Sequence, residues 1–286
     1  MVQFQLTDDL LEKIAVLISA KKNSRLKKIV KDIHFADMAD IINSLNEDQG
    51  IYLIKLFDSE KTSDILTELD ENVREKIFKA LSAKEIAVEI KELDSDDAAD
   101  ILGELPEERK DKVISEISDN DLADDLMELL SYEEDSAGGL MAKELVKANE
   151  NWTVLKSLRE IKKQGENVTR VHSIYVIDDN DKLIGRLSLK DLITSNSKNK
   201  IKDIFIPNVD SVNVNEKGEE VAKIMSKYDL EAIPVVDGKK QLLGRITIDD
   251  IVDFIKDEAE EDYLIAAGVQ GDVEADDSIL ELTKAR

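Results

Sequence analysis

Carboxylate side chains at helical spacing are the groups in this chain that could do chemistry. Asp96 and Asp100 lie four positions apart, which places both on one face of a helix. Asp64 holds the position in an earlier copy of the surrounding phrase that Asp100 holds in its own. Near the end of the chain, one predicted helix carries a row of acids on one face, with two more beside it: Asp250, Asp253, Asp257 and Glu261, then Glu258 and Asp262. Because such carboxylates repel one another, the pattern predicts relief by metal cations.

The bulk composition excludes several other kinds of chemistry. The 286 residues carry a formal net charge of −25, which argues against nucleic acid as a partner and disfavours docking on an anionic membrane. The chain has no cysteine, so disulfides, thiolate metal sites and cysteine nucleophiles are excluded. No apolar run approaches the roughly 18 to 20 residues that span a bilayer, and no signal peptide opens the chain. We therefore expect the chain as given to be soluble.

An enzyme is the least favoured class of protein. The two histidines, His34 and His172, fall in different predicted domains, and we expect both to be structural. The chain has neither a G-x-x-x-x-G-K-[ST] phosphate loop nor a G-x-G-x-x-G fingerprint. We therefore predict that the protein is not an enzyme.

A short phrase repeats through the first 130 residues, which show almost no strand pattern. Its copies are ADIINSL from Ala39, SDILTEL from Ser63, ADILGEL from Ala99 and ADDLMEL from Ala123, with starts 24, 36 and 24 residues apart. Twenty-four residues make a helical hairpin, which buries little alone and must stack on its neighbours. The repeat predicts an α-helical superhelix of short hairpins.

The second half contains a longer duplication. Residues 174–193 read IYVIDDNDKLIGRLSLKDLI, and residues 233–252 read IPVVDGKKQLLGRITIDDIV, 59 positions later without a gap. Each copy predicts a strand, a polar turn, a second strand containing Gly-Arg, and an Asp in the start of a helix. The fold class is therefore α followed by α/β, with two copies of one small domain.

The duplicated phrase resembles a tandem pair of CBS domains, on the strength of GRLSLKD from Gly185 and GRITIDD from Gly244. The whole chain further resembles the cytosolic portion of the MgtE family of magnesium transporters. The carrying phrases are YEEDSAGGLM from Tyr132, DDAADIL from Asp96, YDLEAIPVVD from Tyr228 and the DDIVDFI helix from Asp249.

The resemblance implies four segments. They are a helical N domain at 1–132, a first CBS domain with its lead-in at 133–200, a second at 201–264, and the truncated start of a connecting helix at 265–286. It also implies a homodimer through the CBS domains and a transmembrane pore domain beyond Arg286, with this chain on the cytoplasmic side of the membrane.

The resemblance further implies that the acids bind Mg²⁺ between the N domain, the CBS domains and the connecting helix, and that the bound ions favour a closed pore. The implied ligands are Asp64, Asp96, Asp100, Asp229, Asp250, Asp253, Glu258, Glu261 and Asp262. Two residues depart from the family pattern: Asp64 stands where a longer Glu is familiar, and Lys217 lies near a position where we expect an acid.

Two other interpretations remain open. Paired CBS domains often bind adenine nucleotides, so the chain could instead be a nucleotide sensor that binds ATP, with Asp191 holding the ribose and Arg186 the phosphates. Asp96 and Asp191 could also simply cap helices.

Overall fold

The computed structural model describes residues 4–165, 168 and 170–266, without the side chains of residues 260–262, 264 and 266. The predicted ligands Glu261 and Asp262 and most of the predicted connecting helix, 267–286, therefore lie outside the described residues. The chain divides into two compact units, Met1–Leu130 and Ser131–Arg286. Each unit is described by itself.

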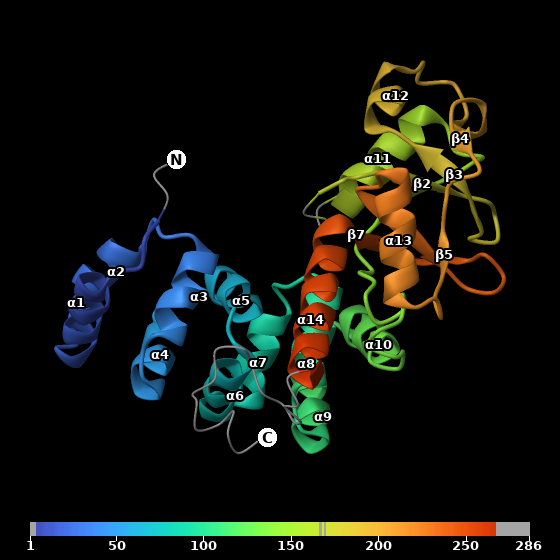
Figure 1. Cartoon of the computed structure of the whole chain (residues 1–286). Helices are drawn as coiled ribbons and strands as arrows, with labels where there is room; N and C mark the ends of the chain where they lie inside the picture. The colour runs from blue at the N-terminus through green and yellow to red at the C-terminus, as the bar shows by residue number, and fades with distance from the viewer. Residues whose placement is uncertain (1–3, 166–167, 169, 267–286) are drawn as a thin grey trace. The chain divides into compact units, whose positions relative to one another are not determined.

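Unit 1 is entirely helical in its described part, as the repeated phrase predicts (Figure 1). Alternate helices contact one another, α3 with α5, α5 with α7, and α7 with α9, which builds a stacked superhelix. The helices are α1 Asp8–Ser19, α2 Asn23–Val30, α3 Phe35–Asn43, α4 Glu47–Ile54, α5 Ser59–Thr67, α6 Glu71–Ala80, α7 Ala83–Ile90, α8 Ser95–Gly103, α9 Glu107–Glu116 and α10 Asn120–Leu129.

The repeated phrase supplies the core of unit 1. Its aliphatic pairs are at most 3% exposed: Ile41 and Ile42, Ile65 and Leu66, Ile101 and Leu102. Several helices of unit 1 begin at polar residues whose side chains accept hydrogen bonds from free amides. Asp58 caps α5, and Ser82 forms a reciprocal capping box with Glu85 at the start of α7. Local capping and the buried pairs together explain why such short helices are stable here.

Unit 2 contains the duplicated domains, each with its own sheet (Figure 1). The first sheet has the order β1-β2-β3-β4 and the second β5-β6-β7. The first copy comprises β1 Val146–Asn149, α11 Val154–Gln164, β2 Ile174–Ile177, β3 Leu183–Leu187 and α12 Leu189–Thr194. The second comprises β4 Ile206–Pro207, which pairs with the first sheet, then β5 Val212–Asn213, α13 Gly218–Tyr228, β6 Ala232–Val236, β7 Leu242–Thr247 and α14 Ile248–Ala266.

The lead-in segment of each copy pairs with the last strand of the other copy. Ile206 and Pro207 of β4 pair with Arg186 and Gly185 in β3, and Ala142 pairs with Arg245 in β7. This exchange explains the glycine of each Gly-Arg pair. A Cβ on Gly185 would lie 2.3 Å from the Ile206 carbonyl oxygen, and one on Gly244 would lie 2.6 Å from the Ala142 carbonyl oxygen. Only glycine permits the lead-in backbones to approach so closely.

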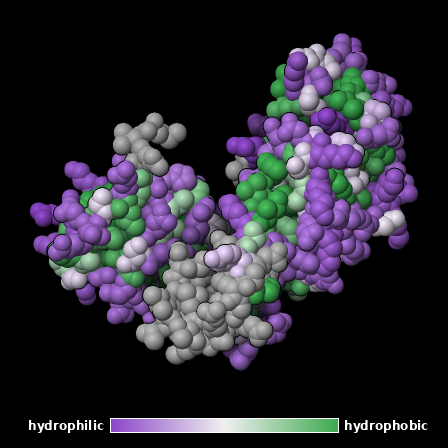
Figure 2. Space-filling model, in the orientation of Figure 1, coloured by the Kyte–Doolittle hydropathy of each residue, from purple (hydrophilic) through white to green (hydrophobic). Residues whose placement is uncertain are grey.

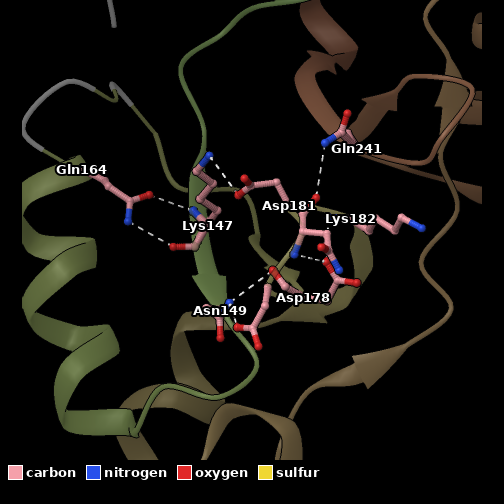
Figure 3. Close-up of polar contacts among 9 residues, drawn as sticks. Lys147, Asn149, Gln164, Asp178, Asp181, Lys182 and Gln241 are labelled. Carbon is pink, nitrogen blue, oxygen red and sulfur yellow. Dashed lines mark hydrogen bonds and ion pairs between the residues drawn. The ribbon is translucent and has the colours of Figure 1, made fainter.

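The turn of each hairpin also forms a backbone hydrogen bond with the turn of the other, at equivalent positions. The Leu183 amide donates to the Lys240 carbonyl at 2.9 Å, and the Leu242 amide donates to the Asp181 carbonyl at 3.1 Å. Asp181 and Lys240 both have positive φ, at 58° and 65°. Figure 3 shows Asp181 and Lys182 beside Gln241, whose side-chain amide donates to a backbone carbonyl of the first turn. Reciprocal bonds between positions 59 apart relate the two copies by an approximate two-fold axis.

The junction that precedes the first copy is anchored to the second. The Ala137 amide donates to Glu216 at 2.7 Å, and the Gly138 amide donates to Val214 at 2.8 Å. A Cβ on Gly139 would lie 2.6 Å from the Glu133 carbonyl oxygen, so the Gly-Gly pair permits a sharp turn there. The backbone at these glycines thus crosses from the first copy to the second.

Candidate metal and nucleotide sites

Asp64 is half-buried on α5 and has an unfavourable electrostatic environment. Burial and the neighbouring Glu60 carboxylate raise its pKa, and His34 only partly offsets them. His34 itself caps α3, since its Nδ1 accepts from the Ala36 amide at 3.3 Å, so the expected structural role is observed. A cation at Asp64 would favour the ionised carboxylate that the protein alone disfavours.

Asp96 and Asp100 both lie on α8, one turn apart. The residue that caps the helix is Asp94, while Asp96 follows in the first turn and accepts from the Asp97 amide at 3.0 Å. Asp96 is 9% exposed, whereas Asp100 is exposed. The shared helix face predicted from the spacing is therefore present, with one carboxylate near the surface and one held close to the backbone.

The aspartates that close the two repeats have matching local structure. The Ser188 hydroxyl donates to Asp191 Oδ2 at 2.7 Å, and the Thr247 hydroxyl donates to Asp250 Oδ2 at 2.5 Å. Both acids lie in the first turn of a helix, α12 and α14, where a negative charge is favourable. Each predicted ligand position thus also serves its own helix start.

The neighbouring Asp249 was not predicted as a site residue. Burial raises its pKa, but hydrogen bonds from Thr247 and its own amide, with electrostatic interactions with His172 and Arg245, outweigh burial and lower it. The surroundings of Asp249 therefore favour its ionised form. The sequence signal was the doubled aspartate, Asp249-Asp250, that the first repeat lacks.

The remaining predicted ligands in unit 2 differ in their surroundings. Asp229 is exposed and ends α13 in the left-handed region, with φ 52°. Asp253 already forms an ion pair with Lys256 on the same helix. Glu258 lies half-buried on α14. A cation at Asp253 would compete with Lys256, a cost that the sequence pattern did not reveal.

Lys217 supplies a positive charge where the family pattern led us to expect an acid. Its ammonium lies 2.8 Å from Glu133 and 2.9 Å from Asp135, both in the junction segment. Hydrogen bonds to Asp135 and Glu133 raise the pKa of Lys217, so it stays charged. The chain thus provides its own cation to these two acids.

A small cavity between the two copies is lined by polar groups, among them His172, Tyr175 and Arg245. Tyr175 is 2% exposed, and its hydroxyl has no hydrogen-bond partner among the described residues; the same holds for Nδ1 of His172. Burial raises the pKa of Tyr175 to about 12. Arg245 also lines this cavity of about 10 Å³, which has room for a single water molecule.

Arg186 and Arg245 hold equivalent positions, yet their environments differ. Arg186, the predicted phosphate contact, is exposed on β3. Arg245 is 6% exposed, and its Nε donates to the Glu144 carbonyl at 2.6 Å.

Among the described residues, no helix is long and apolar enough to cross a membrane.

Family models match both units of the chain. Residues 33–135 match the MgtE intracellular N domain, and residues 137–197 and 201–257 each match the CBS domain. The first match begins after α2, so α1 and α2 precede the family's N-domain pattern.

Curated relatives cover most of the chain. It is 39% identical over 262 residues to the magnesium transporter MgtE of Enterococcus faecalis, covering 90% of this chain and 58% of the relative. It is 40% identical over 134 residues to MgtE of Thermus thermophilus, covering 47% of this chain and 30% of the relative. It is 29% identical over 263 residues to MgtE of Bacillus subtilis, covering 92% and 58%. The chain therefore spans little more than half the length of the relatives that it matches most extensively.

Two solved structures have the same fold. The cytosolic domain of the Mg²⁺ channel MgtE in complex with ATP is 28% identical with a TM-score of 0.79, over 85% of this chain and 99% of that one. The soluble part of a magnesium transporter is 28% identical with a TM-score of 0.75, over 88% and 99%. The chain is thus an MgtE intracellular N domain followed by tandem CBS domains, and it belongs with the MgtE magnesium transporters as a homologue.

Proposed function

We propose that this chain is the Mg²⁺-sensing and gating region of a magnesium transporter, on the cytoplasmic side of the membrane. The observation that carries the proposal is the similarity of both units, in order, to the cytosolic domain of an Mg²⁺ channel. Because the chain spans 58% of the matched MgtE of Enterococcus faecalis, transport itself would belong to a pore domain outside this sequence. The proposed role is regulatory and not enzymatic.

The proposed mechanism is a shift of population by weakly bound ions. Mg²⁺ takes oxygen ligands, keeps several waters and is usually held by one or two carboxylates. Ions that bind better when acids of the two units converge would favour that state by their difference in affinity. The proposed ligands are Asp64, Asp96, Asp100, Asp229, Asp250, Asp253, Glu258, Glu261 and Asp262.

Asp64 gives this mechanism a dependence on pH. Since burial and Glu60 raise its pKa, the folded protein holds a proton there more tightly than an exposed aspartate does. Mg²⁺ must compete with that proton, so binding at Asp64 should weaken as the pH falls toward the raised pKa. Asp64→Asn should remove this part of the pH dependence.

Hydrogen exchange with and without millimolar Mg²⁺ tests the proposal on the full chain. We expect Mg²⁺ to slow exchange in α8 and in α14, and the variant Asp96→Asn with Asp100→Asn to lose that protection. Asp48→Asn with Asp121→Asn is a matched control, because both acids are exposed in first turns of unit 1 helices and neither is a proposed ligand. Equal exchange with and without Mg²⁺ in the parent chain would refute the sensor.

We also propose a homodimer through the CBS domains. Leu189 and Ile193 on α12 are 41% and 63% exposed, and the equivalent Ile248 and Val252 on α14 are 39% and 44% exposed. Figure 2 shows hydrophobic surface among the hydrophilic side chains of unit 2. Two matched apolar faces related by an approximate two-fold axis are suited to a symmetric partner. Sedimentation velocity should find a dimer that Ile193→Glu with Val252→Glu converts to a monomer.

A second candidate function is the sensing of an adenine nucleotide such as ATP. Three observations support it: the similar structure with ATP, the buried Tyr175 hydroxyl without a hydrogen-bond partner among the described residues, and the nearby Arg245. The Ser188–Asp191 pair and the exposed Arg186 are the proposed ribose and phosphate contacts. Since the cavity holds about 10 Å³, a base could enter there only if the two copies move apart.

Calorimetric titration with ATP separates the two candidates. A nucleotide sensor should bind ATP without Mg²⁺, and Asp191→Asn should weaken that binding. A sensor of Mg²⁺ alone should give hydrogen-exchange protection with MgCl₂ and no heat with ATP. Asp203→Asn is a suitable control, because Asp203 is exposed and is not a proposed nucleotide contact.

A further inference from the structure

The first two helices carry a positive charge that contrasts with the rest of the chain. Residues 4–31 contain seven basic and three acidic residues, within a chain whose net charge is −25. All seven basic side chains are exposed: Lys13, Lys21, Lys22, Arg25, Lys27, Lys28 and Lys31. None of the seven forms an ion pair with an acid in the part of the chain that the structure describes. We call these residues the basic patch.

The basic patch lies around an open groove with an aliphatic lining. The groove between α1 and α2 has a volume of about 490 Å³, and its apolar side chains are Val16, Leu17 and Ile29. Val16 is 59% exposed. Its polar lining combines three basic side chains, Lys13, Arg25 and Lys28, with two acidic ones, Asp9 and Glu12. Figure 2 shows hydrophilic side chains over this end of unit 1, with apolar atoms between them.

Both helices are anchored through the opposite side, so the patch is free to contact a partner. Ile14 and Ile18 of α1 and Leu26 and Val30 of α2 are at most 6% exposed and form the packed face. Lys27 and Lys28 therefore point away from the core on a well-fixed helix. Within unit 1, α1 and α2 lie at the end away from α9 and α10 (Figure 1).

We propose that the basic patch docks on an anionic phospholipid surface. Clusters of four to eight Lys and Arg on an amphipathic helix bind anionic lipid headgroups, and exposed aliphatic residues add contact with the acyl boundary. The acidic excess of the chain does not prevent this, since charges beyond about 8 Å from the contact are largely screened at physiological salt. A bilayer is favoured over an acidic protein because the chain is homologous to membrane transporters.

This inference goes beyond the proposed Mg²⁺ sensing and does not depend on it. The first family match begins at residue 33, so the patch precedes the family's N-domain pattern, and none of the proposed Mg²⁺ ligands lies within it. The proposal differs from the expectation, based on net charge alone, that the chain avoids anionic membranes. Local charge, and not the sum, decides a contact at short range.

Cosedimentation of the full chain with vesicles tests the proposal. We expect binding to vesicles of phosphatidylcholine and phosphatidylglycerol in equal parts, little binding to phosphatidylcholine alone, and loss of binding at high salt. Lys27→Gln with Lys28→Gln should weaken the partition coefficient by about thirtyfold, because each lysine contributes about fivefold near an anionic surface. Val16→Asp should weaken it further without touching the basic residues.

The matched control removes two lysines elsewhere in unit 1. Lys79 and Lys112 are exposed on α6 and α9, each within an ion pair. Lys79→Gln with Lys112→Gln should bind vesicles as the parent does. The proposal is overturned if the parent ignores anionic vesicles at low salt, if both lipid mixtures bind equally, or if the two double variants lose equal affinity. It is also overturned if the Lys27 and Lys28 variant changes only self-association, which would indicate an acidic face of a second copy as the partner.

Discussion

The two CBS copies share a sequence phrase and a backbone, yet they place equivalent side chains in different environments. Both copies carry a register shift at the same place, after Val176 and after Val235. Arg186 is exposed in the first copy, whereas Arg245 is 6% exposed in the second. The first copy ends in α12, of 6 residues, and the second in α14, of 19 residues. The comparison teaches that the duplicated sequence determines the shared backbone. The segments that pack over each copy determine how equivalent side chains are buried.

The largest expected effect comes from removing the buried arginine. Arg245→Ala should destabilise the protein by about 3 kcal/mol, because it leaves a cavity and removes the bond to the Glu144 carbonyl. Arg186→Ala should change stability by about 0.5 kcal/mol or less, as exposed substitutions do. Urea unfolding of both variants measures the difference. Equal losses would mean that the two positions are equivalent after all.

The glycines beside these arginines should behave alike. Gly185→Ala and Gly244→Ala should each cost about 2 kcal/mol, since a Cβ would meet a lead-in carbonyl in both copies. Gly238→Ala is the control, because a Cβ there meets nothing within 4 Å. Thermal unfolding measures the three variants. A loss in only one copy would contradict the exchange of lead-in segments.

Tyr175 should make the stability depend on alkaline pH. Burial raises its pKa from 10.0 to about 12, so the folded state holds the proton more tightly than the unfolded state. This contribution is fully present below about pH 10 and is lost as the pH rises toward about 12, at about 1.4 kcal/mol for each unit. Tyrosinate absorbance and urea unfolding in parallel measure it.

Tyr175→Phe sharpens this test. The variant should abolish the alkaline loss and should leave the stability at neutral pH unchanged or slightly higher, because the lost hydroxyl has no partner among the described residues. The equivalent position in the second copy is Pro234, which cannot titrate. If the alkaline loss persists in the variant, another group causes it.

The smallest expected effect is shared by the two helix caps. Ser188→Ala should cost about 1 kcal/mol, because the hydroxyl caps α12 and donates to Asp191. Thr247→Ala should cost a similar amount through Asp250. Chemical unfolding measures both, and Thr194→Ala, whose hydroxyl bonds only within α12, is the control. A much larger cost at Thr247 would indicate that the long acidic helix depends on this cap.

The sequence predicted the helical repeat, the duplication and most helix starts, since these follow from local patterns. Asp58 and Ser82 are residue types that favour helix starts, and both cap helices in the structure. Trp152 packs against the first CBS core. The metal-binding roles of the acids stay predictions, because spacing places a carboxylate on a face without saying what faces it.

What the sequence determined by itself is periodic: the helices, the strands, the doubled domain and the family. What only the tertiary structure decided is contact between distant segments. Arg245 is buried under the first lead-in, and Lys217 forms ion pairs with residues far away in the chain. Distant segments also bury the hydroxyl of Tyr175, which has no hydrogen-bond partner among the described residues. Periodicity reports which face a residue occupies, but burial and charge pairing depend on the segment that the fold brings against it.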